Sequence, residues 1–493
     1  MVALPKIIQG GMGVGVSNWR LARAVSSTGQ LGVVSGTALD QVFVRRLADG
    51  DWGGHMRRAL DSFPFPEMAK RLWNEYFVPG GKAEDAPYPA TPMHQLREPR
   101  KLIELCMAAN FVEVFLAREG HKNPVGINYL EKVQLPHLAS IYGAMLAGVG
   151  YVLMGAGIPL HIPGVLDALV AHGIAEYKLS VTGAVAGQGE DATMRLDPAE
   201  FAEGLLPQLT RPRFLAIVSS HTLAATLLRR ANGKVDGFVV EGPTAGGHNA
   251  PPRGKLQLSG MGEPLYGERD RVDAADFRAL EVPFWLAGGY ASNARLEEAL
   301  GEGAAGVQVG TAFAFSRESA LREDLKSSLL AQAGEGEARV FTDPLASPTG
   351  FPFKVAQVEG SLSDAETYEG RTRVCDLGFL REAYAREDGK VAYRCSAEPT
   401  NCYTSKGGQI EATEGRKCLC NALLSNIGLA QVRANGTVEA ALVTLGDDLN
   451  IVRRFLPAGG TSYGAADVVR AILGEPEETK EEKEVSTFTP MTA

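Results

Sequence analysis

The sequence predicts an α/β protein: a (β/α)8 TIM barrel with a helical insertion after strand 2 and a smaller C-terminal extension. Short apolar runs alternate with helical segments, which is typical of a parallel sheet covered on both faces. Eight such units fit within about 310 residues. Glycine-rich loops follow nearly every strand. A barrel collects such loops on one active face, whereas an open sheet has its site at one switch point.

The predicted strands are apolar runs rich in β-branched residues. They comprise residues 5–9, 31–35, 125–129, 151–154, 214–218, 235–240, 282–287 and 305–309, and a further strand is considered at 177–181. Helices are expected between them, at residues 18–28, 137–147, 165–172, 222–231 and 293–301. Ser17 is a candidate N-cap of the first helix, because its hydroxyl can accept a hydrogen bond from a free backbone N–H.

At 493 residues the chain exceeds what one hydrophobic core usually serves, so we expect several regions. Residues 1–350 are the predicted barrel, with a mostly helical insertion at 37–124. The proline- and glycine-rich centre of this insertion is either a surface excursion or a lid that carries Trp73, Tyr76 and Phe77. Residues 351–474 form a cysteine-containing C-terminal region, and 475–493 read as a disordered acidic tail.

Composition excludes several function classes. A net charge of −9 argues against nucleic-acid binding, which needs a basic surface. Residues 133–166 carry no formal charge, but prolines and glycines interrupt them, so no membrane span is predicted. No signal peptide is visible at the N-terminus, and we expect a cytoplasmic protein with reduced thiols.

The loop at residues 240–249 (VEGPTAGGHN) is the strongest candidate for chemistry. It follows a buried strand, and its glycines let backbone amides approach a ligand. It ends in His248, a side chain suited to proton transfer near neutral pH. His221, at the end of another strand, is the alternative catalytic histidine. The GxGxG loop at residues 11–15 is not taken as a dinucleotide fingerprint, because no acidic residue ends the second strand.

Two loops are predicted to bind a phosphate. Gly288-Gly289 and Gly310-Thr311 follow the seventh and eighth strands, where barrels frequently hold this group. Glycine loops offer unobstructed N–H donors, and Thr311 adds a hydroxyl. Phosphate would therefore be bound by backbone dipoles without a lysine.

Five motifs together resemble the nitronate monooxygenase (2-nitropropane dioxygenase) family, whose superfamily includes flavin-dependent enoyl reductases. They are residues 7–12 (IIQGGM), 125–128 (VGIN), 241–248 (EGPTAGGH), 287–289 (AGG) and 308–311 (QVGT), and the resemblance covers roughly residues 4–350. It implies an FMN-binding TIM barrel with His248 as the catalytic histidine. The cofactor-binding residues that it implies are Gly11, Met12, Gly13, Asn128, Glu241, Gly246, Gly288, Gly289, Gln308, Val309, Gly310 and Thr311.

The chain departs from the family pattern in three places. Position 241 is Glu where many members have Gln, the insertion at 37–124 is long, and residues 249–270 add a segment beside His248. The last two departures flank the expected substrate side and leave the substrate open.

The function that the resemblance implies is oxidation of alkyl nitronates by molecular oxygen with FMN. The flavin supplies the redox step, while His248 acts as a base toward a nitroalkane or as a hydrogen-bonding partner of a nitronate. Two alternatives stay open: an NAD(P)H-dependent enoyl-thioester reductase, and a non-catalytic flavin-binding or redox-sensing protein. The expected partner is a small-molecule substrate, with neither nucleic acid nor membrane, and the oligomeric state is open.

Five cysteines lie in the C-terminal region: Cys375, Cys395, Cys402, Cys418 and Cys420. The last four fall close together, but their spacing matches neither zinc ribbons nor the common ferredoxin runs. The sequence leaves open whether Cys395, Cys402, Cys418 and Cys420 bind a metal or an iron–sulfur cluster, or are unligated.

Overall fold

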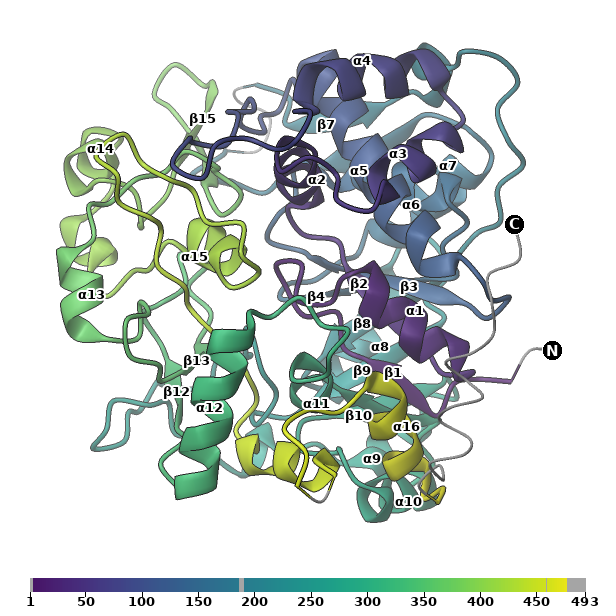
Figure 1. The fold of residues 1–493 in the computed structure, drawn as a ribbon, viewed down its shortest axis with the longest axis vertical. Coiled ribbons are helices and arrows are strands. Elements are labelled where there is room, and N and C mark those ends of the chain that lie inside the picture. The colour runs from purple at the N-terminus through teal and green to yellow at the C-terminus, as the bar shows by residue number, and fades with distance from the viewer. Residues whose placement is uncertain (1–2, 186–189, 458, 477–493) are drawn as a thin grey trace.

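Eight parallel strands form one sheet that closes into a barrel (Figure 1). Neighbours pair in chain order, and a bridge between Ile8 and Leu31 joins the first strand to the second. The barrel strands are β1 (Ile7–Gln9), β2 (Gly32–Ser35), β3 (Val125–Leu130), β4 (Tyr151–Gly155), β8 (Arg213–Val218), β9 (Gly237–Glu241), β10 (Phe284–Ala287) and β11 (Gly306–Val309). This computed structural model describes residues 3–185, 190–457 and 459–476. The prediction of a TIM barrel is confirmed.

The interior of the barrel is filled by side chains. Ile8, Val239 and Trp285 belong to one buried cluster contributed by different strands, and Trp285 is completely buried. Its indole Nε1 donates to the carbonyl of Pro5 at 2.8 Å, which satisfies the one polar atom of this large side chain. The barrel is therefore a packed core rather than a channel.

Helices cover the outside of the barrel. They are α1 (Trp19–Ser27), α6 (His137–Leu146), α7 (Ile162–Val170), α8 (His221–Arg230), α9 (Ala274–Arg278), α10 (Asn293–Gly301), α11 (Thr311–Ala314) and α12 (Glu323–Glu335). The predicted cap of the first helix was wrong by one residue, because the side chain of Asn18 accepts from the Leu21 N–H. The Ser17 hydroxyl instead donates to the Gly10 carbonyl and accepts from the Met12 N–H, each at 2.9 Å. Ser17 thus shapes the loop after β1.

The insertion after β2 is helical, as predicted. It contains α2 (Leu39–Ala48), α3 (His55–Asp61), α4 (Pro66–Tyr76) and α5 (Arg100–Arg118). Helix α5 packs against α1 and α6, so it takes the position of the second barrel helix. Residues 77–99 contain neither helix nor strand.

The further strand considered at residues 177–181 lies outside the barrel. Strand β5 (Ala175–Lys178) pairs antiparallel with β7 (Thr193–Leu196), and a short 3-10 turn, η1 (Pro198–Phe201), follows. The residues of β5 alternate between buried and exposed, which suits a two-stranded surface sheet.

The C-terminal extension lies beside the barrel (Figure 1). Its elements are β12 (Val340–Asp343), β13 (Phe353–Ala356), α13 (Ala365–Gly370), β14 (Glu382–Ala385), β15 (Val391–Arg394), α14 (Thr400–Ser405), α15 (Leu419–Ser425) and α16 (Ala465–Leu473), with the 3-10 turns η3 (Ile410–Thr413) and η4 (Leu449–Phe455). Strands β12 and β13 pair with each other, so the boundary expected at residue 350 falls inside one hairpin. Helix α16 returns to the barrel and packs against α1 and α10.

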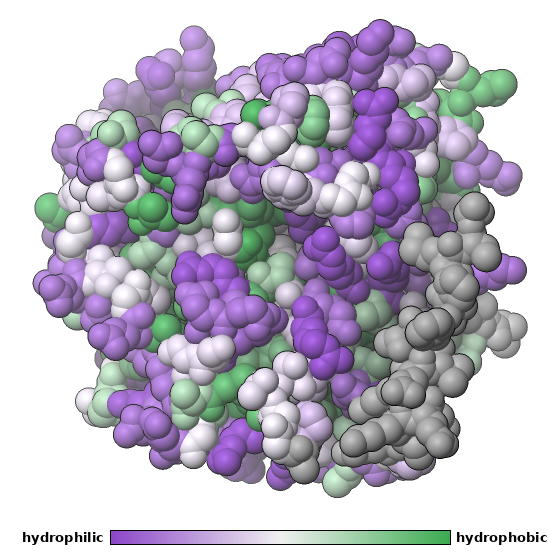
Figure 2. Space-filling model, in the orientation of Figure 1, coloured by the Kyte–Doolittle hydropathy of each residue, from purple (hydrophilic) through white to green (hydrophobic). Residues whose placement is uncertain are grey.

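The barrel and the extension are also joined by a sheet. Strand β14 of the extension pairs in parallel with β6 (Val181–Thr182), which lies in the long connection between β4 and β8. Hydrophilic side chains predominate on the face in Figure 2, with apolar ones in small separate areas. Among the residues that the structure describes, no helix is both long and apolar enough to cross a membrane. Residues 477–493, most of the predicted acidic tail, lie outside the described part.

Candidate functional site

A cavity of about 240 Å³ lies at the carboxyl ends of the barrel strands. The loops after β1, β3, β9, β10 and β11 contribute to its wall, as expected for the active face of a TIM barrel. We call it the main cavity. The catalytic histidine and the twelve cofactor-binding residues that the resemblance implies all line it: Gly11, Met12, Gly13, Asn128, Glu241, Gly246, His248, Gly288, Gly289, Gln308, Val309, Gly310 and Thr311.

The loop that carries His248 is fixed by pairing with β13. The Asn249 N–H donates to the Pro352 carbonyl and the Lys354 N–H donates to the Gly247 carbonyl, each at 2.9 Å. His248 packs its ring against Phe353, with ring centroids 4.7 Å apart. These contacts hold the imidazole at the cavity wall and leave it few alternative orientations.

The imidazole of His248 has one polar protein partner. Its Nε2 lies 2.7 Å from Oγ of Ser347, whose hydroxyl is in turn 2.8 Å from Oγ1 of Thr349. Burial lowers the pKa of His248 to about 4, so the ring is neutral near pH 7. A neutral imidazole is a weak base, but it presents one N–H donor and one acceptor nitrogen to a ligand.

Glu241 ends β9 and also lines the main cavity. Burial raises the pKa of this carboxyl from 4.5 to about 7. A protonated carboxyl offers one O–H donor and one carbonyl acceptor, which resembles the donor and acceptor pair of a Gln side chain. A protonated Glu241 can therefore make the same kinds of hydrogen bond as the Gln that many family members have at this position.

One polar atom on the cavity wall lacks a partner. Oε1 of Gln308 is buried and accepts no hydrogen bond within the described residues, although Gln308 lines the cavity. Nδ2 of Asn128 donates to the Gly11 carbonyl over 3.4 Å, which is long for a hydrogen bond. Buried polar groups are rarely left unpaired, so these side chains suit a ligand with several hydrogen-bonding groups, such as a flavin.

The predicted phosphate-binding loops follow two neighbouring strands, β10 and β11, and both line the main cavity. Gly288 has φ +100° and Gly289 has φ +80°, values that side-chain-bearing residues rarely adopt. A Cβ at Gly288 would also lie 2.7 Å from Oγ1 of Thr244. The Thr311 hydroxyl accepts from the Gly446 N–H at 2.9 Å, which leaves its own proton for a ligand. The arrangement fits an anion bound by backbone amides.

The extension completes this wall, which the sequence did not predict. Thr444, Leu445, Gly446 and Asp448 line the main cavity, as do Leu423 and Ile451. The Thr444 hydroxyl accepts from the Gly247 N–H at 2.9 Å, and a Cβ at Gly246 would meet the Leu445 backbone at 2.8 Å. No local motif marks residues 444–448. Their contact with the backbone of the loop after β9 can be seen only in the folded structure.

A second cavity of about 200 Å³ adjoins the first. The two share Glu241 and His248, so His248 lies between them. Residues from the added segment after His248, among them Arg253 and Tyr266, line this adjoining cavity. The segment therefore lies beside His248 and forms part of the wall of the adjoining cavity.

Other candidates lie away from the cavities. His221 begins α8 and lines neither cavity; its ring faces Phe277 at 6.2 Å. Trp73, Tyr76 and Phe77 of the insertion also line neither cavity. In this structure the insertion therefore places none of these three aromatic side chains over the site.

A buried charged group lies in the insertion. His94 has Glu98 against Nδ1, while Oδ2 of Asp40 is 3.4 Å and Sγ of Cys106 is 3.9 Å from Nε2. Burial alone would lower the pKa of His94, but Cys106, Glu98 and Asp40 raise it well above its ordinary value. An imidazolium between two carboxylates explains this arrangement without a metal ion.

Comparison with known proteins finds a family match for part of this chain. Residues 205–344 match the family model described as nitronate monooxygenase. This match confirms the resemblance that the motifs indicated, for the segment that it covers. A Rhodococcus jostii protein named (3aS,4S,5R,7aS)-5-hydroxy-7a-methyl-1-oxo-octahydro-1H-indene-4-carboxyl-CoA dehydrogenase is 30% identical over 118 residues. The match spans 24% of this chain and 29% of that relative.

Two solved structures align with nearly the whole of this chain. FabK from Thermotoga maritima is 16% identical with a TM-score of 0.47, covering 98% of this chain and 94% of its own. A nitroalkane oxidase from Streptomyces ansochromogenes is 15% identical with a TM-score of 0.44, covering 99% and 98%. Because both TM-scores are below 0.5, the fold assignment rests on the strand order of the barrel itself.

Proposed function

Because residues 205–344 are a nitronate monooxygenase domain, we propose that this protein is a cytoplasmic FMN-dependent oxidoreductase that oxidises alkyl nitronates with molecular oxygen. The observation that carries the proposal is the position of His248. It lies in the wall of a cavity that the glycine loops after β10 and β11 also line. One cavity thus combines an imidazole with loops whose backbone amides suit an anion.

The main cavity has groups suited to each part of FMN. Gly288, Gly289, Gly310 and Thr311 would hold the phosphate through backbone N–H groups and one hydroxyl. The unpartnered Oε1 of Gln308 would accept from the polar middle or ring of the flavin. When bound, FMN supplies the electron transfer, and the protein positions the reacting groups.

The state of His248 favours an anionic substrate. A neutral imidazole with a pKa near 4 removes a proton from a carbon acid poorly, but its N–H can donate to a negatively charged nitro oxygen. Among the described residues that line the main cavity there is no lysine or arginine. The donors available to a nitronate, which arrives already deprotonated, are therefore neutral groups: His248, backbone amides, and the hydroxyl and amide side chains of the wall.

The test uses the full chain loaded with FMN. We expect the protein to bind FMN and to consume oxygen when an alkyl nitronate such as propionate-3-nitronate is added, with much less consumption on the corresponding neutral nitroalkane. Flavin absorption measures the first and an oxygen electrode the second. A protein that does not take up FMN, or FMN-loaded protein that consumes no oxygen with nitronate, would contradict the proposal.

A second candidate is an NAD(P)H-dependent enoyl-thioester reductase. Two observations favour it: the relative from Rhodococcus is named for a CoA thioester, and the adjoining cavity offers room for an acyl chain beside His248. This candidate predicts that NAD(P)H reduces bound FMN in the absence of oxygen and of any nitronate. An enoyl-CoA thioester would then reoxidise the flavin. Neither step is expected of a nitronate oxidase.

A further inference from the structure

Four cysteines of the extension enclose one small cavity that is almost entirely apolar. They are Cys375, Cys395, Cys418 and Cys420, and they come from three separate stretches of the chain. The rest of the wall is Pro348, Leu377, Gly378, Leu380, Ala397 and Leu419. Cys402, which the sequence grouped with three of these residues, is exposed on α14 and does not line the cavity.

All four cysteines are at least partly buried, and they meet at one place in the fold. Cys395 and Cys418 are buried, while Cys375 and Cys420 are partly buried, and all four are free thiols. Four thiols from distant positions gather around a common centre only if the surrounding loops are shaped for it. Structural cysteines that merely fill a core do not need to face one another.

Backbone N–H groups lie close to two of the sulfurs. Those of Phe379 and Leu380 are near Cys420, and that of Ala397 is near Cys395. Such N–H groups stabilise negative charge on sulfur and adjust the properties of thiolate-bound metal centres.

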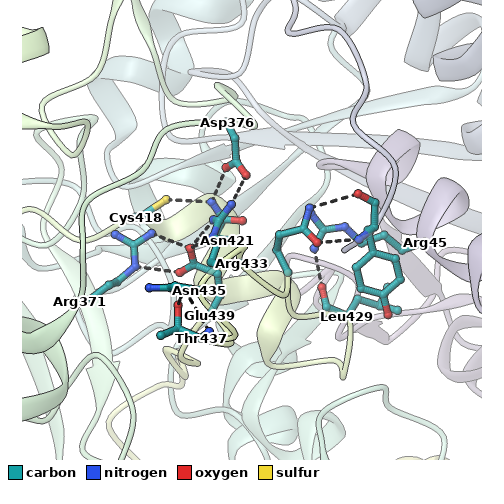
Figure 3. A network of polar contacts seen from close by, with 12 residues as sticks. Arg45, Arg371, Asp376, Cys418, Asn421, Leu429, Arg433, Asn435, Thr437 and Glu439 are labelled. Atoms are coloured by element: carbon teal, nitrogen blue, oxygen red, sulfur yellow. Dashed lines mark hydrogen bonds and ion pairs between the residues drawn. The ribbon is translucent and has the colours of Figure 1, made fainter. Parts of the chain in front are cut away.

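Cys418 has the same kind of partner, and the amide Nδ2 of Asn421 lies 3.5 Å from its sulfur (Figure 3). Nδ2 of Asn421 also donates to Oδ1 of Asp376 at 2.8 Å, which holds the amide in place. The polar groups around this sulfur are therefore fixed by the fold.

Positive charge is available close to the site. Arg371 lies beside Cys418 (Figure 3) and is held there by Glu439, with Nε 2.8 Å from Oε2. Arg381 is close enough to Cys375 to act on it electrostatically. A metal centre with four thiolate ligands carries net negative charge, and partly buried guanidinium groups offset the cost of burying it.

The spacing of the sulfurs argues against a single zinc ion. Four sulfurs around one zinc at about 2.3 Å lie roughly 3.8 Å apart. Within the described residues, the group whose potential ligand atoms all lie within 4.8 Å of one another is Asp40, His94 and Cys106, and it includes none of the four cysteines. No three of the four sulfurs therefore meet the spacing of a single zinc site, whereas a cluster of several iron ions allows its ligands to lie further apart.

We propose that Cys375, Cys395, Cys418 and Cys420 ligate an iron–sulfur cluster. Four thiolates are the usual ligand set of both [2Fe–2S] and [4Fe–4S] clusters. Each thiol gives up its proton to solvent as its sulfur binds iron, and the inorganic sulfide bridges the iron ions. The proposal does not depend on the substrate of the main cavity, because its test measures iron and sulfide.

Helix α15 connects this site to the main cavity. Cys420 lies near its start and Leu423, three residues later, lines the main cavity. Three residues of helix span about 4.5 Å along the axis. The cluster would therefore lie next to the wall of the flavin cavity rather than in a remote part of the extension.

The experiment is purification of the full chain without oxygen, followed by assays of iron and acid-labile sulfide. Protein that has lost its metal is reconstituted with ferric iron, a thiol reductant and sulfide under the same conditions, so that the iron can reach the ferric content of an oxidised cluster. We expect iron and sulfide in equal amounts, two or four of each per chain, and an electron paramagnetic resonance signal that appears on reduction with dithionite. The number of iron ions distinguishes the two cluster types.

Single substitutions identify the ligands. Cys375→Ser, Cys395→Ser, Cys418→Ser and Cys420→Ser should each lose most of the iron or change the resonance signal. Cys402→Ser is the matched control and should retain both. FMN content and the thermal melting curve show whether each variant is folded. If the buried variants do not fold, Cys375→Ser, at a half-buried position, decides the matter.

Several results would overturn the proposal. Protein that stays free of iron and sulfide after reconstitution would do so, as would one zinc per chain without sulfide. A disulfide between Cys375 and Cys395, detected by mass spectrometry, would also contradict it. Folded Cys375→Ser protein with the full iron content, or equal iron loss in Cys402→Ser, would show that other residues hold the metal.

Discussion

In the proposed function His248 would act through hydrogen bonding rather than charge, because burial keeps its imidazole neutral over the physiological range. The Ser347 hydroxyl at 2.7 Å from Nε2 fixes the orientation of the ring, so Nδ1 is the atom that can reach a ligand. Removal of this side chain should affect turnover and leave the predicted phosphate-binding loops after β10 and β11 in place.

We predict that His248→Ala lowers the turnover of FMN-loaded protein by about 10²–10³, the range found when one hydrogen-bond donor to negative charge is removed from an active site. FMN affinity should change little. Oxygen consumption and flavin fluorescence measure the two quantities. His221→Ala is the control, since His221 lines neither cavity and its removal should leave turnover intact. Loss of flavin from His248→Ala would instead assign a structural role.

Glu241 gives a pH dependence to stability. Its folded pKa is raised from 4.5 to about 7, so the folded state keeps a proton that the unfolded chain releases. Below pH 4.5 both states are protonated and there is no cost. As pH rises from 4.5 to 7 the folded state becomes progressively less favourable, and above pH 7 the cost stays constant.

We predict that Glu241→Gln removes this dependence. Since one pKa unit corresponds to 1.36 kcal/mol, the variant should gain at most roughly 3 kcal/mol in free energy of unfolding at pH 8, and close to nothing at pH 4. Urea unfolding at both pH values gives the comparison. Equal gains at the two pH values would indicate that packing, and not the charge of Glu241, separates the variants.

At the scale of elements, the loop after β10 is the part least able to accept a side chain. Gly288 combines a positive φ with a Cβ position only 2.7 Å from Oγ1 of Thr244. We predict that Gly288→Ala weakens FMN binding at least tenfold, because the loop must shift to relieve this contact. Fluorescence titration with FMN measures the change.

The matched control for this loop is Gly336→Ala. Gly336 ends α12 with φ +78°, and a Cβ there would meet nothing within 4 Å. The backbone conformation should cost each variant about 1–3 kcal/mol in stability, but only Gly288→Ala should alter FMN affinity. A similar change in FMN affinity for both variants would mean that global destabilisation causes the effect.

Strand and loop positions in the barrel were predictable from local sequence. Each barrel strand is a short apolar run followed by a turn, so both periodicity and glycine placement mark it. His248 and the two glycine loops were found for the same reason. The run at residues 177–181 has similar composition, yet β5 pairs with β7 at the surface, because composition does not report which partner a strand will find.

The contribution of the extension could not be predicted. Thr444 and Gly446 touch the loop after β9 and Thr311 from well over a hundred residues away, through single hydrogen bonds with no sequence signature. Which four cysteines form the cysteine site could be predicted only in part. Closeness in sequence favoured Cys402, which points to solvent, over Cys375, which the fold brings to the other three.

At the scale of the whole molecule, the insertion and the extension are held together. Nη2 of Arg381 donates to the His94 carbonyl at 2.5 Å, and the Leu96 N–H donates to the Tyr393 hydroxyl at 2.6 Å. Nη1 of the buried Arg45 donates to the Leu429 carbonyl (Figure 3). The charged group around His94 lies at this junction.

We predict that His94→Ala lowers the free energy of unfolding by about 3–5 kcal/mol at pH 6, because it leaves Asp40 and Glu98 buried without their cation. The raised folded pKa means that the stabilisation is complete below pH 6.5 and is lost as pH rises through the folded value. The difference between wild type and variant should therefore shrink in alkaline solution.

Denaturant unfolding at pH 6 and at pH 9.5 tests this dependence, with Asp61→Asn as the control. Asp61 pairs with Arg57 on the surface, where both side chains are more than half exposed, so its loss should cost less than about 1 kcal/mol at either pH. A deficit for His94→Ala that grows with pH would contradict the assigned charge.

The hydrogen bonds from Gly446 to Thr311 and from Gly247 to Thr444 also bear on biosynthesis. A ribosome completes the eighth barrel strand long before it reaches residue 444. Until that segment has emerged and docked, the phosphate loops lack one wall. If FMN binds as we propose, the nascent chain cannot retain it, and the cofactor enters only after translation is almost finished.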